Sequence, residues 1–159
     1  MALVYFALIL LSIVFGTLTI HRNNVALVTP SVHQLQVTND AGEFVAYRDA
    51  VTNYMAAHST FTGIVPAASL AGQFSASFLA SVGNNVTATG TAGRVITCYG
   101  SLSAGSVQSA LRLTGGDAAI GTSNGTTWTS AASNAVQTPT ALSVPVPAGN
   151  IVSVIQLGS

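Results

Sequence analysis

The sequence is poor in charge and contains no lysine. Charged residues make up 5% of the chain, and its four arginines balance its four acidic residues, which gives a formal net charge of zero. Globular proteins carry about a quarter charged residues. A neutral chain without lysine lacks the basic surface that nucleic acid binding requires and the polybasic patch that attracts anionic lipids. We therefore expect no nucleic acid partner, while near-zero net charge favours association, including association of copies of the chain.

Cysteine is almost absent as well. The only cysteine is Cys98, so neither an intramolecular disulfide nor a metal site made of several thiolates is available. It lies in the apolar run 95–99, which predicts a small buried side chain, with pairing to another chain as the alternative.

Motifs that would indicate catalysis are missing too. His21, His33 and His58 do not have the spacing of a zinc-binding helix, and no phosphate-binding glycine loop with its lysine is present. The serine-hydrolase pattern G-x-S-x-G is absent. We expect no catalytic residue, no cofactor and no metal site, and we interpret the chain as non-enzymatic.

What the chain does have is a long apolar run at residues 2–20, without a single charge. Nineteen helical residues at about 1.5 Å each reach roughly 28 Å, close to the hydrocarbon thickness of a bilayer. No basic residue precedes the run and no clear cleavage site follows it, which favours an uncleaved anchor over a signal peptide. A pilin would have a short basic leader ending in glycine and an early glutamate, and neither is seen. Within the anchor, Ser12 and Gly16 are the expected helix contact points because small and polar residues let membrane helices pack closely.

The rest of the sequence predicts a connector at 21–40 and a small domain at 41–159. Asp40 and Glu43 have the spacing of a helix capping box, and the helix would run to about His58. One face of it carries apolar residues at three- and four-residue steps: Phe44, Tyr47, Val51, Tyr54 and Met55. We interpret this face as core, with docking of a partner as the alternative, and we expect Arg48 and Asp49 to be solvated.

Strand and turn signals follow this helix. Residues 94–99 and 151–157 are β-branched runs, and Asn124-Gly125 predicts a tight hairpin between strands at 118–122 and 126–130. Turns are predicted at 83–85 and 90–93, a second helix at 103–113 ending at Gly115-Gly116, and a polar loop at 131–150. The fold class is therefore α+β: an N-terminal transmembrane helix, an amphipathic helix, and a small antiparallel sheet with a second helix.

Several of these segments resemble one known family. They are 44–51 with Tyr54, 63–66 with Leu70, Gly93-Arg94-Val95, 111–116 and 151–157. Together they resemble the PilM proteins of plasmid- and island-encoded thin type IV pilus systems, which differ from the cytoplasmic actin-like protein of the same name. The chain departs from that pattern at Asp49, where asparagine is common, and in its Ser/Thr/Gly-rich stretch 83–93.

The resemblance implies a part in pilus biogenesis, often linked to conjugation, without an assigned activity. We expect a single-pass protein of the bacterial inner membrane with a periplasmic domain, and pilin or other pilus-assembly proteins as partners. A pilin-like subunit, packed into a filament through its apolar helix, is the alternative. The expected contact residues are Ser12, Gly16, Phe44, Tyr47, Val51, Tyr54 and Met55.

Overall fold

The computed structural model describes residues 31–70, 72–90 and 92–158. The chain divides into two compact units, 1–35 and 36–159. Of the first unit only residues 31–35 are described, and they begin the first helix. No helix in the described ranges is both long enough and apolar enough to span a bilayer. The predicted anchor at 2–20, with Ser12 and Gly16, lies outside these ranges.

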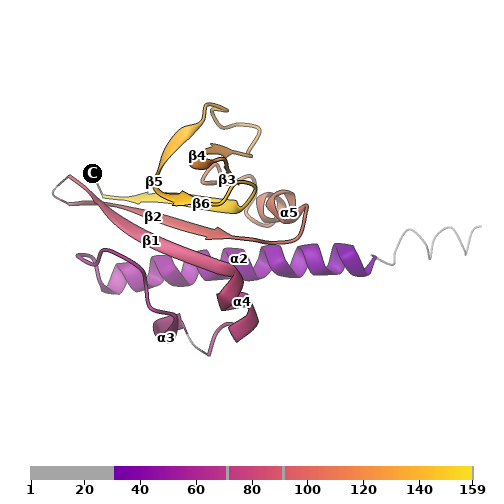
Figure 1. The fold of residues 1–159 in the computed structure, drawn as a ribbon, viewed down its shortest axis with the longest axis horizontal. Coiled ribbons are helices and arrows are strands. Elements are labelled where there is room, and N and C mark those ends of the chain that lie inside the picture. Colours follow the sequence, from indigo (N-terminus) through magenta and orange to yellow (C-terminus); the bar gives the residue numbers. More distant parts are fainter. Residues whose placement is uncertain (1–30, 71, 91, 159) are drawn as a thin grey trace, which may run out of the picture. The chain divides into compact units, whose positions relative to one another are not determined.

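Four helices and six strands make up the described chain, and Figure 1 shows their order. The helices are α2 (Val32–Ala57), α3 (Ala67–Leu70), α4 (Ala76–Ser81) and α5 (Ser106–Leu113). The strands are β1 (Val82–Thr89), β2 (Gly93–Gly100), β3 (Ile120–Ser123), β4 (Gly125–Ser130), β5 (Thr140–Val146) and β6 (Ile151–Leu157).

Helix α2 is longer than the sequence indicated. It starts at Val32, so residues 32–40 of the predicted connector are helical. The expected cap at Asp40 is wrong: Ser31 and Gln34 form the capping box instead, with Gln34 N donating to Ser31 Oγ (3.1 Å) and Ser31 N to Gln34 Oε1 (3.2 Å). Asp40 lies inside the helix, where its carboxylate accepts hydrogen bonds from the backbone N–H and the hydroxyl of Ser103.

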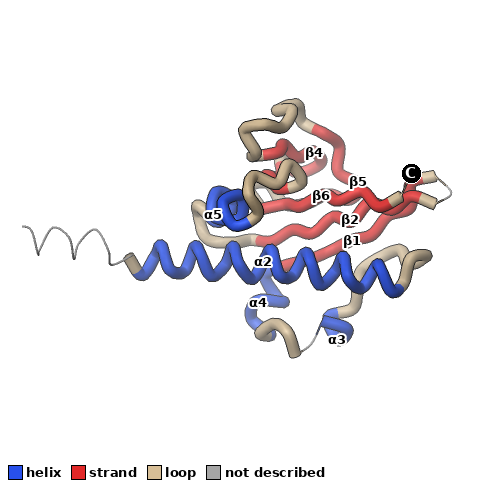
Figure 2. The backbone as a smooth tube through the Cα atoms, turned by 180° about the vertical axis from the view of Figure 1, so that it is seen from behind, coloured by secondary structure: helices blue, strands red, loops and turns tan. Residues whose placement is uncertain are grey.

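The strands form one antiparallel sheet in the order β1-β2-β6-β3-β4-β5. In Figures 1 and 2, α2 runs along one side of this sheet, with α3 and α4 near the β1 edge. The sheet curls, so that edge strand β5 returns over β2, where Ser143 Oγ lies 3.3 Å from Thr97 Oγ1. The predicted α+β class with an antiparallel sheet is confirmed, and the curl brings the sheet close to a barrel.

Two strands replace segments for which the sequence predicted turn or loop. The turn expected at 83–85 is wrong, because these residues lie within β1 and pair with β2. The loop expected at 131–150 contains β5, which ends in Pro145-Val146. Proline has no N–H for a sheet ladder and is tolerated at an edge, and β5 is an edge strand.

The other predicted elements agree with the structure. Strands β2 and β6 match the two β-branched runs, and Asn124-Gly125 joins β3 to β4 with Gly125 at φ +94°. Helix α5 begins at Ser106, three residues later than expected. It ends as predicted, because Gly116 N donates to Leu111 O (2.8 Å) from a left-handed conformation.

Candidate functional site

The apolar face of α2 lies in the core. Phe44, Tyr47, Val51 and Met55 are at most 2% exposed, in one cluster with β1 and β2 residues such as Val86 and Ile96. Core packing, the first of the two interpretations, describes these four side chains. Tyr54 is half-buried and stacks on His58 with ring centroids 4.1 Å apart. Contact of this face with a partner stays a prediction, and in the described chain four of its five residues pack internally.

Two charged side chains that the sequence predicts to be solvated differ in exposure: the Asp49 side chain is 57% exposed, as predicted, whereas the Arg48 side chain is not. The expectation for Arg48 is wrong: its side chain is only 11% exposed, and it donates from Nη1 to Asp117 Oδ2 and from Nε and Nη2 to Asp49 Oδ1 (3.1 Å each). A buried guanidinium needs such carboxylate acceptors. Asp117 lies in the turn after α5. The Arg48–Asp117 ion pair therefore connects α2 to a turn that is 69 residues away in the sequence.

A second polar cluster lies deeper. Asn84 of β1 donates from Nδ2 to Tyr47 Oη (2.7 Å) and to Val65 O (3.3 Å), and it accepts from Val65 N (2.7 Å). The side-chain amide of Asn84 forms these hydrogen bonds with buried groups of Tyr47 and Val65. The bonds offset the cost of burying a polar side chain, which explains why asparagine is tolerated in this strand. Burial raises the pKa of Tyr47 to about 12, against the opposing effect of the Asn84 hydrogen bond.

Cys98 is fully buried and free. Desolvation raises the pKa of its thiol to about 12, although the nearby Arg48 guanidinium acts in the opposite direction. The thiol is therefore protonated at neutral pH, and the thiolate is the nucleophilic form. The predicted small buried side chain is confirmed.

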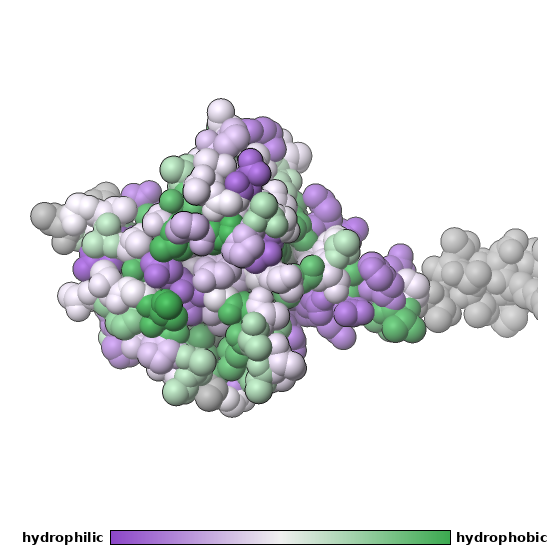
Figure 3. Space-filling view, in the orientation of Figure 1, coloured by the Kyte–Doolittle hydropathy of each residue, from purple (hydrophilic) through white to green (hydrophobic). Residues whose placement is uncertain are grey.

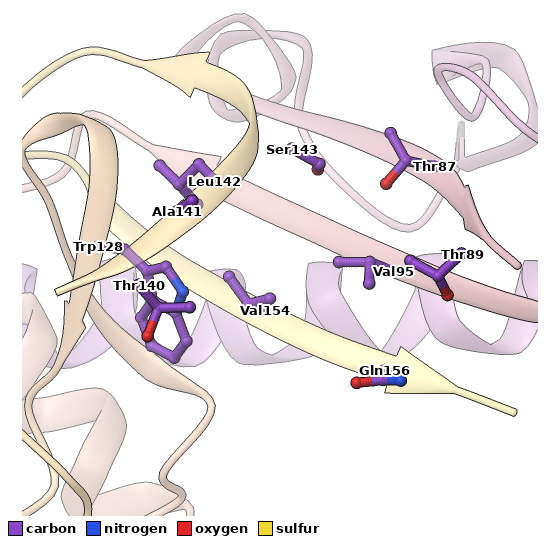
Figure 4. Close-up of a pocket in the computed structure, with 10 residues that line it drawn as sticks. All are labelled: Thr87, Thr89, Val95, Trp128, Thr140, Ala141, Leu142, Ser143, Val154 and Gln156. Carbon is purple, nitrogen blue, oxygen red and sulfur yellow. The ribbon is translucent and has the colours of Figure 1, made fainter. Parts of the chain in front are cut away.

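A groove lies on the other face of the sheet, away from α2 (Figure 4). Its volume is about 530 Å³. Side chains from five strands line it: Thr87 and Thr89 of β1, Val95 of β2, Trp128 of β4, Thr140 to Ser143 of β5, and Val154 and Gln156 of β6. The curl of the sheet forms this groove, because β5 rises over β2 and β6 as one wall and β1 provides the other.

Two residues that line the groove have buried polar atoms without a hydrogen bond in the described ranges, Trp128 Nε1 and Thr87 Oγ1. The same holds for Arg94 Nε, Ser106 Oγ and Ser153 Oγ, which do not line the groove, so such atoms do not distinguish it from the rest of the fold. Sequence reasoning missed this site, although Trp128 is the only tryptophan of the chain and lies in a predicted strand.

The ionisable side chains of the described ranges do not gather into a metal-binding set. No group of three or more His, Cys, Asp or Glu residues capable of holding an ion occurs within residues 31–70, 72–90 and 92–158. The face of the molecule in Figure 3 intersperses pale, weakly polar residues with hydrophilic (purple) and hydrophobic (green) ones.

Comparison with known proteins decides the family. A family model described as PilM matches residues 9–154, nearly the whole chain. The chain belongs to the PilM family. A search of curated proteins gave no match. Among solved structures, the fold is similar to that of an Escherichia coli B7A protein that carries the provisional name PilM, with a TM-score of 0.58 and 14% identity over 80% of this chain and 97% of that one.

This comparison confirms the resemblance seen in the sequence to the PilM proteins of thin pilus systems. At 14% identity, the structural match concerns the fold alone. The match covers nearly all of the E. coli chain. Membership of the PilM family suggests a part in pilus biogenesis.

Proposed function

We propose that the chain is a non-enzymatic, membrane-anchored component of type IV pilus biogenesis that acts through protein–protein contacts. The observation that carries this proposal is the family match over residues 9–154. The apolar run at 2–20 would hold the chain in the bacterial inner membrane as a single-pass protein. The domain formed by the rest of the chain would lie in the periplasm and contact pilin or other assembly proteins.

Two features support a role in binding rather than catalysis. The Arg48–Asp117 ion pair is partly buried and the Tyr47–Asn84 hydrogen bond is buried, and both connect secondary-structure elements. Cys98, the most nucleophilic residue type in the chain, is buried with a raised thiol pKa. These side chains support the fold, and the exposed surface remains for contacts. A link to conjugation follows from the systems in which this family occurs and belongs to the same proposal.

Cross-linking in living cells tests the proposal. The full chain is expressed with a C-terminal tag in a host that carries the pilus system, and cross-linked complexes are purified from the membrane fraction. Recovery of pilin or an assembly protein is expected. Recovery of the chain from the soluble fraction, or from membranes without any pilus-system protein, would overturn it.

The N-terminus of the purified chain separates this proposal from a filament subunit. Mass spectrometry of the mature protein should find residues 2–20 retained. Loss of a leader together with recovery of the chain from sheared pili would instead place it in the filament, where the apolar helix would pack among its copies.

A further inference from the structure

The C-terminal part of the chain carries no charge. Asp117 is the last charged residue, so residues 118–159, which include strands β3 to β6, contain neither an acidic nor a basic side chain. A chemical change that created a charge in this part would alter its surface. Asparagine is one of the thermolabile residues, and Asn124 is the only asparagine of the sequence that is followed by glycine.

The Asn124-Gly125 pair lies at the end of the β3–β4 hairpin. Asn124 is exposed, and its carboxamide forms no hydrogen bond within the described residues, so the side chain can turn toward the next peptide group. The N–H of Gly125 donates to a side chain, Ser123 Oγ (3.0 Å), and not to a backbone carbonyl of β3. A Cβ on Gly125 would meet no atom within 4 Å, so the space beside this nitrogen is open. Glycine itself has no Cβ to hinder the approach of another group to its backbone.

We propose that Asn124 is a site of spontaneous deamidation. The Gly125 nitrogen loses its proton to solvent and forms a bond with Asn124 Cγ. The Cγ–Nδ2 bond breaks, and the departing NH2 group takes up a proton and leaves as ammonia. Water then opens the cyclic imide by breaking one of the two bonds between its carbonyl carbons and the Gly125 nitrogen. The products are aspartate and isoaspartate, and each carries one negative charge. The reaction needs only water, so it does not depend on the proposed role in pilus biogenesis.

The new carboxylate would lie where the hairpin meets the loop between β5 and β6. Ser123, the residue before Asn124, holds these segments together. Its N–H donates to Asn150 O (3.0 Å), its carbonyl accepts from Gly149 N (2.9 Å), and its hydroxyl donates to Val146 O (2.8 Å). In the isoaspartate product the main chain runs through Cγ and is longer directly after this fixed residue. Deamidation would therefore place the only charge of residues 118–159 at this end of the sheet.

Incubation of the purified full chain in neutral and mildly alkaline buffer tests this proposal. Anion exchange should separate an acidic form that accumulates with time, and faster at higher pH because the Gly125 nitrogen must lose its proton. Peptide mass spectrometry should locate the replacement of NH2 by OH at Asn124. Asn134 is equally exposed but is followed by alanine, and it should react at least about tenfold more slowly because of the alanine Cβ. Asn124→Gln should form no acidic product at this position, since its longer side chain closes a ring less readily.

Three results would overturn the proposal. One is a folded chain, checked by circular dichroism, that stays unmodified while the same chain unfolded in guanidinium chloride is deamidated, because the hairpin would then protect Asn124. Another is an acidic form that Asn124→Gln accumulates at the same rate, since the reaction would then occur elsewhere. The third is equal modification of Asn124 and Asn134, which would remove the role of Gly125.

Discussion

The two faces of the sheet differ in how they are covered. The face toward α2 is closed: Asn84 bonds to Tyr47 and Val65, and Arg48 is held by two carboxylates. The opposite face carries a groove of about 530 Å³, lined by half-buried and exposed side chains such as Val95 and Gln156. Because stabilisation by apolar side chains grows with the area removed from water, packing on the face toward α2 should contribute more to stability than packing on the groove face.

Two neighbouring residues of β2 should show this difference most strongly. Ile96 points toward α2 and is fully buried, while Val95 points into the groove and is half-buried. Ile96→Ala should lower the free energy of unfolding by about 2–5 kcal/mol. Val95→Ala should lower it by about 1 kcal/mol, since little burial is lost. Denaturant titration of both variants checks this, and equal losses would contradict the contrast between faces.

Arg48 should matter far more than an exposed arginine. Arg48→Met leaves Asp117 without its main donor and should cost about 1.5–3 kcal/mol, the range for hydrogen bonds to charged groups. Arg112→Met is the matched control, because Arg112 is exposed on α5 and bonds only to the nearby Ser109 hydroxyl. Its effect should be within about 0.5 kcal/mol. Thermal unfolding compares the two, and an equally harmful Arg112→Met would argue against a special role for the Arg48–Asp117 pair.

Two glycines should respond in opposite directions. A Cβ on Gly121 would lie 2.0 Å from the backbone carbonyl oxygen of Thr129, where β3 and β4 curl tightly. Gly121→Ala should therefore destabilise the chain by about 1–3 kcal/mol. Gly42 lies within α2 with open space around it, so Gly42→Ala should stabilise by about 0.5–1 kcal/mol. Unfolding curves of both variants test whether β3 and β4 approach each other this closely at Gly121. A Gly121→Ala variant with unchanged stability would contradict the close approach.

Alkaline pH should weaken the closed face. Burial raises the pKa of Tyr47 from 10.0 and that of Cys98 from 9.0, each to about 12. Because the folded state holds these protons more tightly than the unfolded state, their contribution is complete below pH 9 and is lost as pH rises toward 12. Tyr47→Phe should cost about 1 kcal/mol at neutral pH through the lost Asn84 bond, and it should flatten the alkaline decline. Stability measured against pH in both proteins checks this, and an unchanged slope would contradict it.

Local sequence signals predicted the elements whose structure depends on their own residues. The β-branched run of β2, the closing strand β6, the Asn-Gly hairpin and the glycine end of α5 all follow from backbone preferences. The core role of the α2 face follows from its helical spacing. In each of these segments, a few neighbouring residues are enough to determine the secondary structure.

The elements that were predicted wrongly from the sequence depend on residues that are distant along the chain. Gly83-Asn84 reads as a turn, but Asn84 bonds to Tyr47 and Val65, and the Tyr99 ring leaves no room for a side chain at position 83. Asp40 has the spacing of a helix cap, but its carboxylate accepts a hydrogen bond from Ser103, which is 63 residues away in the sequence. The groove could not be predicted either, since its wall β5 contains Pro145 and its lining comes from five strands.

Pilus assembly in cells that lack the native protein tests the proposed function most directly. Because membership of the PilM family suggests a part in pilus biogenesis, we expect these cells to lose assembly and the full chain to restore it. Cells that assemble pili equally well without the chain would contradict the proposed part in pilus biogenesis.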